Sequence, residues 1–118
     1  HIDDMTDLYA ECLNWPSTIF DGQVYNVGYE NHSVMTIAQK VRAIVGDSVS
    51  VKVLPTDDLR SYHISSEKIR KELGFELKHS IEDAVIDLKK AFDAGNIPNP
   101  LGDIRYYNIK TMQANDMR

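Results

Sequence analysis

The chain has 118 residues, 42% of them hydrophobic and 26% charged, with thirteen Lys and Arg against eighteen Asp and Glu. This composition is typical of one globular domain and excludes a disordered or collagen-like chain. The net charge of −5 argues against affinity gained from nucleic-acid phosphates or anionic lipid, so we expect no nucleic-acid and no membrane partner. The single cysteine excludes an internal disulfide, and we expect a cytoplasmic protein.

The first predicted elements are a helix and a strand. Apolar residues recur at helical spacing over residues 5–13, and this pattern stops before Pro16, which disfavours helical geometry in the residue preceding it. Residues 23–27 are β-rich and are followed by Gly28. They predict a short strand that leads into a loop.

The middle of the chain predicts a second helix and further strands. Ser33 is a suitable N-cap for an apolar stripe that Gly46 ends, so this helix has the clearest signal in the sequence. Valines alternate with polar residues over 49–53, which predicts a strand with one solvated face. Residues 62–64 predict a possible further short strand.

Two more helices follow, and each has a recognisable cap. A serine pair at 65–66 precedes a helix that Gly74 ends. Ser80 begins the last helix, with Asp83 in the position where a capping box usually has Glu. The residues from 98 to 118 are rich in Pro, Asn and Gly at their start and predict an irregular tail.

Together these elements predict an α/β fold with three to four main helices and two or three short strands. We expect a substrate-binding portion over residues 1–97 and an irregular carboxy-terminal tail over 98–118. Only one strand-helix-strand passage is available for a right-handed crossover, which is too little sheet for a full doubly wound domain.

The glycines do not predict a dinucleotide-binding loop or a P-loop. Such loops need closely spaced glycines, so that backbone N–H groups approach the phosphates. The six glycines, of which no two are closer than six residues, are at positions 22, 28, 46, 74, 95 and 102.

Other candidate chemistry is weak. The histidines at 1, 32, 63 and 79 lack the close spacing of metal ligands, so surface or capping roles explain them better. Cys12 lies on an apolar helical stripe and is expected in the core. Tyr106 and Lys110 have the spacing of a proton-transfer pair, but about 0.4 such pairs arise by chance from this composition. We therefore assign no catalytic residue and no metal ligand.

Two local groups remain as candidate binding residues. Arg60 and Tyr62 follow a predicted strand, and a guanidinium suits phosphate oxygens, although Arg60 is equally explained as a surface partner of the aspartates before it. Asn26 and Gly28 lie at the carboxyl end of a predicted strand, where open α/β sheets bind ligands. A glycine at that place is more often only a turn.

Five segments in order resemble the carboxy-terminal third of the extended short-chain dehydrogenase/reductases, the NAD(P)-dependent nucleotide-sugar epimerases and dehydratases. Each motif is weak alone, but their order spans nearly all of the chain. The segments are H-I-D-D-M-T-D at 1–7, Y-N-V-G at 25–28, D-L-R-S-Y at 58–62, K-x-x-x-x-L-G-F at 68–75 and S-I-E-D at 80–83.

The resemblance implies that this chain supplies substrate recognition and not catalysis. Arg60 resembles the arginine that meets the substrate diphosphate, Tyr62 is expected to line the same site, and the loop after Asn26 and Gly28 is expected near the cleft. The glycine-rich NAD or NADP loop and the catalytic Tyr and Lys would precede His1, so no cofactor is expected on this chain alone. Basic residues that flank the arginine in some relatives are absent here.

We therefore expect a piece of a nucleotide-sugar epimerase or dehydratase that is inactive alone. The resemblance implies that the strand at 23–27 joins a sheet formed with residues outside this chain. Without that sheet its unpaired edge favours self-association, so we expect a homo-oligomer. The alternative is a free-standing nucleotide-diphosphate-binding or oligomerisation module without catalysis.

Overall fold

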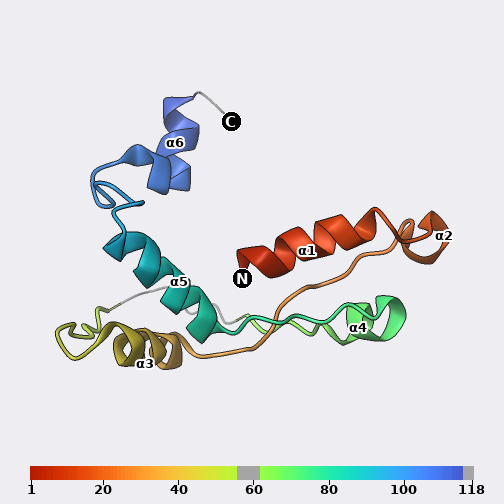
Figure 1. Cartoon of the computed structure of the whole chain (residues 1–118), viewed down its shortest axis with the longest axis horizontal. Coiled ribbons are helices and arrows are strands. Elements are labelled where there is room, and N and C mark those ends of the chain that lie inside the picture. The colour runs from red at the N-terminus through yellow and green to blue at the C-terminus, as the bar shows by residue number, and fades with distance from the viewer. Residues whose placement is uncertain (56–61, 116–118) are drawn as a thin grey trace. The chain divides into compact units, whose positions relative to one another are not determined.

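The computed structural model describes residues 1–55 and 62–115, and within these ranges the regular elements are all helical. The chain divides into two units, His1–Ile86 and Asp87–Arg118. The elements in chain order are α1 (Ile2–Cys12), α2 (Ser17–Phe20), α3 (Val34–Val45), α4 (Glu67–Leu73), α5 (Ile81–Asp93), the 3-10 helix η1 (Ile104–Tyr106) and α6 (Asn108–Ala114) (Figure 1).

The helices expected in the first half of the chain are confirmed, and their caps explain their limits. The His1 side chain caps α1 by accepting a hydrogen bond from the Asp3 backbone N–H at 3.2 Å. Ser33 Oγ accepts from the Thr36 backbone N–H at 3.1 Å at the start of α3. Gly46, with φ of 117°, follows α3 in a conformation that side chains rarely adopt.

The expected helices of the second half are also confirmed. Gly74 takes the left-handed conformation, with φ of 70°, and ends α4. At the start of α5, Ser80 and Asp83 form the expected capping box. The Ser80 N–H donates to Asp83 Oδ2 at 2.8 Å, and the Asp83 N–H donates to Ser80 Oγ at 3.2 Å.

The predicted α/β fold is wrong: residues 23–27, 49–53 and 62–64 form no strand in the described part of the chain. A strand is stabilised by hydrogen bonds to a neighbouring strand, and here polar groups of these segments have other partners. Lys68 Nζ donates to the Val24 carbonyl at 3.2 Å. The Asn31 side-chain NH₂ donates to the Ile64 carbonyl at 2.9 Å, and the Asn31 side-chain oxygen accepts from the Ile64 N–H at 3.0 Å. In the first and third of these segments, side-chain bonds therefore occupy backbone groups that a ladder would use.

The expectation of an irregular segment after residue 98 is corrected as well, because η1 and α6 lie there. Asp103 Oδ1 accepts from the Arg105 backbone N–H at 2.9 Å and caps η1. Thr111 Oγ1 then donates to the Ile104 carbonyl at 2.6 Å, which joins α6 to η1. Both elements are short, so they lack the long apolar stripe on which the prediction of a helix depended.

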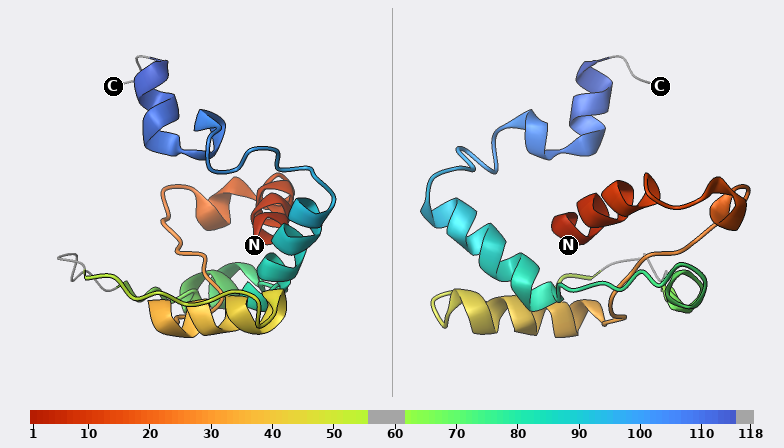
Figure 2. Two further views of the ribbon diagram at one scale, coloured as in Figure 1. Left: turned by 90° about the vertical axis from the view of Figure 1, so that its left-hand side faces the viewer. Right: turned by 45° about the vertical axis from the view of Figure 1, so that its right-hand side comes forward.

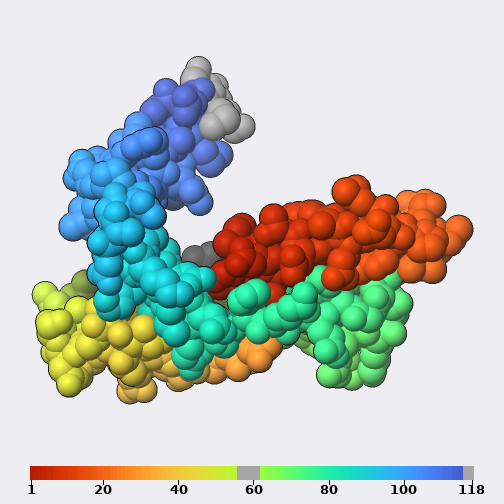
Figure 3. Space-filling view, in the orientation of Figure 1, coloured from red at the N-terminus to blue at the C-terminus, as the bar shows by residue number. Residues whose placement is uncertain are grey.

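The core of the first unit is small and joins α1 to α4 and the segment after it. Its buried residues are Leu8, Ile69 and Phe75. Trp15 meets the Phe75 ring edge-on, with 6.4 Å between ring centroids. Figure 3 shows α1 lying against the segment that follows α4. None of the helices in the described residues, in this unit or the other, has both the length and the apolar character that a membrane span requires.

Asp4 adds a polar connection beside this core. Its carboxylate is 1% exposed and accepts from the backbone N–H groups of Lys78 and His79, at 3.0 and 3.1 Å. It also bonds His79 Nδ1 at 2.8 Å. Elsewhere in the unit, Lys40 of α3 pairs with Glu82 in the first turn of α5, and Figure 2 shows the start of α5 beside α3. Polar side chains thus connect segments that the apolar core does not reach.

Candidate functional site

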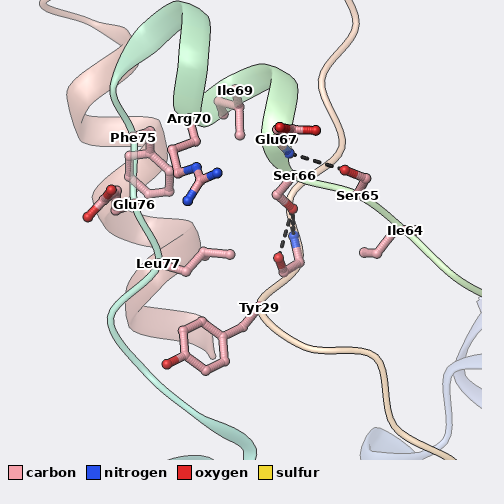
Figure 4. A pocket seen from close by; sticks show the side chains of 11 residues that line it. Tyr29, Ile64, Ser65, Ser66, Glu67, Ile69, Arg70, Phe75, Glu76 and Leu77 are labelled. Atoms are coloured by element: carbon pink, nitrogen blue, oxygen red, sulfur yellow. Dashed lines mark hydrogen bonds between the residues drawn. The ribbon is translucent and has the colours of Figure 1, made fainter.

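A pocket of about 520 Å³ lies beside Gly28 in the first unit. Its volume falls in the range of small-molecule sites, about 300 to 1,000 Å³. Three segments form it: the loop at 28–29, the start of α4 with the residues before it, and the segment after α4. The lining residues of this Gly28 pocket are Gly28, Tyr29, Ile64, Ser65, Ser66, Glu67, Ile69, Arg70, Phe75, Glu76 and Leu77 (Figure 4).

The Ser66 hydroxyl forms hydrogen bonds with both backbone groups of Gly28. The Gly28 N–H donates to Ser66 Oγ at 2.7 Å, and the same hydroxyl donates to the Gly28 carbonyl at 2.7 Å. A Cβ at this position would lie 2.9 Å from Ile64 Cγ1, and still closer to the end of that side chain. A side chain at position 28 would therefore require the Ile64 side chain to move, whereas the backbone angle at Gly28 is not unusual. The loop and the start of α4 are fixed to each other at this wall.

Arg70 gives the pocket its positive charge. Figure 4 shows its side chain extending from α4 between Phe75 and Ser66, with Tyr29 at the opposite end. Over residues 1–55 and 62–115, no carboxylate oxygen lies within 4.0 Å of the Arg70 guanidinium. The nearby Glu67 bonds Lys71 instead, at 2.7 Å, and that bond holds its pKa below the usual value. The guanidinium is thus available for an anionic ligand.

The structure brings together only part of the predicted site. Gly28 lines the pocket, whereas Asn26, two residues earlier, is exposed and does not line it. Tyr62 is 73% exposed and is not a lining residue either. Arg60 lies outside the described residues and precedes the lining residue Ile64 by four positions. The proposed roles of Arg60 and Tyr62 therefore stay predictions.

Sequence reasoning predicted one of the eleven lining residues, Gly28, and missed the other ten, among them Ser66, Arg70 and Tyr29. Ser66 was considered only as a helix cap, but its hydroxyl bonds the backbone of Gly28. The N–H of Glu67, at the start of α4, donates to the hydroxyl of Ser65, at 3.3 Å. Arg70 lies on α4 one turn after Glu67, and Tyr29 follows Gly28 directly. No local pattern marks these residues, because the pocket forms from segments almost forty positions apart.

A second polar cluster surrounds Asp4, where sequence spacing predicted separate histidines. His1 caps α1 as expected, but its ring also stacks on that of His79, with 4.5 Å between centroids and 24° between planes. Burial raises the pKa of Asp4, and its hydrogen bonds from His79 and Lys78 outweigh this and lower it overall. The same bond to Asp4 raises the pKa of His79 above its usual value.

The remaining candidates, Cys12 and the Tyr106–Lys110 pair, lie outside the residues that line the Gly28 pocket. Cys12 is partly buried and packs against the core, as its place on the apolar stripe predicted. Tyr106 belongs to η1 and Lys110 to α6, so they do not share one continuous helix. The Lys110 ammonium lies over the Tyr107 ring instead, 4.1 Å from its centroid.

Gly28 is the glycine that lines the pocket, and its backbone N–H already donates to Ser66 Oγ at 2.7 Å. Comparison of the sequence and structure with protein-family models, curated proteins and solved structures found no match.

Proposed function

We propose that this chain recognises a nucleotide-diphosphate sugar for an NAD-dependent epimerase or dehydratase whose cofactor loop and catalytic groups are not among these 118 residues. The observation that carries this proposal is the Gly28 pocket, which contains a predicted site residue and an arginine without an ion-pair partner in the described chain. The five ordered motifs that resemble this family support the same substrate class.

The lining of the pocket suits a ligand that is both anionic and ring-shaped. A guanidinium offers two parallel N–H donors to phosphate oxygens, which is the part Arg70 would play. Tyr29, half-exposed at the other end, offers an aromatic face for a sugar or base. Glu67 and Glu76 lie among the lining residues and suit sugar hydroxyls, which are hydrogen-bond donors.

Arg60 is the second arginine of the proposal. It resembles the family arginine that meets the diphosphate, and it precedes the pocket wall at Ile64 by four positions in sequence. Two arginines on one diphosphate would share its negative charge, so each is expected to contribute to affinity. Tyr62 is proposed to contact the same ligand.

The test is a calorimetric titration of the chain with UDP-, GDP-, CDP- and dTDP-sugars. We expect one of them to bind with one ligand per chain, and Arg70→Ala and Arg60→Ala each to weaken binding about tenfold or more. Arg42→Ala is the matched control. Arg42 lies on α3, away from the lining residues, and pairs with Asp47 at 3.6 Å, so its removal is expected to leave affinity unchanged.

Two results would contradict the proposal: no binding of any of the four sugars, or arginine variants at both positions that bind as the wild type does. Equal affinity for the free nucleoside diphosphate and for its sugar would favour the module that binds nucleotide diphosphates without recognising the sugar.

We also propose that the protein is cytoplasmic and associates with itself. The unpaired strand edge that first suggested self-association is not present in the described residues, but exposed apolar side chains are. Leu13 is 88% exposed, Val34 84% and Val24 81%. Covering such side chains is favourable in water. Sedimentation velocity is expected to show a dimer or larger species, and a monomer at all concentrations would contradict this.

A further inference from the structure

The strongest unassigned feature is the group formed by His1, Asp3 and His79 at the start of α1. One possible ligand atom from each of the three side chains lies within 4.8 Å of the others. His1 Nδ1 and Asp3 Oδ2 are 3.7 Å apart. We propose that these three side chains form a binding site for a divalent transition metal of the Zn²⁺ type, with water completing the coordination. Two imidazoles and one carboxylate are ligands that Zn²⁺ accepts.

The orientation of His79 supports this assignment. Its Nδ1 lies 2.8 Å from the Asp4 carboxylate, which is almost fully buried. An ionised carboxylate only accepts hydrogen bonds, so Nδ1 carries the hydrogen, and in the neutral ring Nε2 then has the lone pair. A buried carboxylate that orients a histidine in this way is the usual outer partner of a zinc-binding imidazole. Asp4 would therefore be a positioning residue and not a ligand.

His1 would contribute Nδ1, which now accepts a hydrogen bond from the Asp3 backbone N–H at 3.2 Å. That N–H is at the exposed start of α1, so water can take the place of His1 when the metal takes the lone pair. Asp3 and His79 give access from solvent, because their side chains are 61% and 32% exposed. The His1 side chain is 6% exposed and forms the inner wall.

The charges around the site favour a cation. The amino ends of α1 and α5 oppose positive charge, but the Asp3, Asp4 and Asp83 carboxylates all act electrostatically on His79. Two ligands of a tetrahedral zinc ion are about 3.4 Å apart, given bonds of about 2.1 Å. The atoms therefore need to approach by roughly 1 Å, and rotation of the exposed Asp3 side chain supplies part of this movement. Because the lone pair of an imidazole lies in the plane of its ring, metal binding also requires the His1 ring to turn out of its stacked position on His79.

The test is titration of the untagged full chain with Zn²⁺ in the calorimeter, with Co²⁺ absorption spectra as a second readout. His79→Asn is the key variant, because the asparagine NH₂ can donate to Asp4 in the place of Nδ1 while Nε2 is lost. Asp3→Asn removes the exposed carboxylate. His63→Asn and His32→Asn are the matched controls, since neither belongs to the cluster. Circular dichroism confirms that each variant is folded.

We expect one Zn²⁺ per chain with micromolar affinity, weakened about tenfold or more by His79→Asn and by Asp3→Asn and unchanged by either control. The proposal would be overturned by wild-type binding weaker than about 100 μM, or by equal binding in folded His79→Asn and Asp3→Asn.

Discussion

The hydrogen bonds within the first unit of this chain differ in range from those within the second. In His1–Ile86, hydrogen bonds join segments far apart in sequence: Asp4 to His79 across 75 positions, and Gly28 to Ser66 across 38. In the second unit the bonds described are local, such as Thr111 to Ile104 across seven positions and Arg105 to Asp103 across two. A long-range bond closes a large loop, so its loss frees much more chain than the loss of a local one.

This difference indicates which substitutions are expected to reduce the stability of the protein most. Among its described residues the first unit has three buried apolar side chains, so a few polar side chains carry much of its long-range order. Buried polar groups without a partner cost more than exposed ones, which remain hydrated. Removal of one buried polar side chain is therefore expected to destabilise the first unit strongly. Removal of one exposed side chain in the second unit is expected to disturb only its local turn.

The largest effect is expected from Asp4→Ala. This change leaves the backbone N–H groups of Lys78 and His79 without their acceptor next to the core. We expect the free energy of unfolding to fall by about 3 kcal/mol or more, measured by urea denaturation with circular dichroism.

Asp7→Ala is the matched control, because Asp7 lies one turn later on α1 and its side chain bonds the exposed Lys78 ammonium, at 3.1 Å, and no other group among the described residues. Its loss is expected to change stability far less. Equal destabilisation by the two substitutions would contradict the role assigned to Asp4.

A smaller effect is expected from Ser66→Ala, which removes the hydroxyl that bonds both the N–H and the carbonyl of Gly28. Stability should fall by about 1–2 kcal/mol, and hydrogen exchange at the Gly28 amide should become faster. Ser65→Ala is the control, since in the described part of the chain the Ser65 hydroxyl accepts from the exposed Glu67 N–H and does not bond Gly28. Unchanged exchange at Gly28 would show that the wall of the pocket does not depend on Ser66.

The stability of the protein is also expected to change with pH. The hydrogen bond between His79 and Asp4 raises the pKa of His79 above 6.5. The stabilisation that protonated His79 gives is therefore complete below pH 6.5 and is lost as the pH rises through the raised pKa. The pKa of Asp4 is lowered below 3.8, so its contribution is lost only as the pH falls through that lower value. The urea midpoint should therefore decrease as the pH is raised from about 6 into the alkaline range, through the raised pKa of His79.

His79→Asn should reduce this decrease, because asparagine does not titrate in that range. An equal decrease in the variant would assign the pH dependence to other groups.

The smallest effect is expected from Arg105→Ala. Arg105 bonds Asp103 through its exposed guanidinium, with Nε 2.9 Å from Oδ2, so its loss disturbs η1 locally. Hydrogen exchange over residues 1–86 should match that of the wild type. Faster exchange at Gly28 or Lys78 in this variant would show that the two units depend on each other.

The sequence predicted what local chemistry decides. The caps at Ser33 and at Ser80 with Asp83, and the helix end at Gly74, lie where expected, because each involves residues within a turn of one another. The strands were not predictable in the same way. A β-rich segment such as 23–27 becomes a strand only if another segment pairs with it, and here the side chain of Lys68 bonds its backbone.

The same distinction applies to the sites. Gly28 was identifiable because it ends a short motif, whereas Arg70 and Ser66 join it only when segments almost forty positions apart meet. Likewise, His1 and His79 had no spacing that predicts a metal site, and their rings meet because Asp4 bonds the backbone at 78–79. Tertiary hydrogen bonds, which sequence spacing does not show, create both places.

The most direct test of the central claim is an amide NMR titration of the chain with the nucleotide sugar that binds best in calorimetry. Recognition in the Gly28 pocket predicts saturable shifts of the Gly28, Tyr29, Ser66 and Arg70 amides, with those of α6 unchanged. Saturable shifts confined to other residues, with these four unmoved, would contradict the assignment of this pocket as the nucleotide-sugar site.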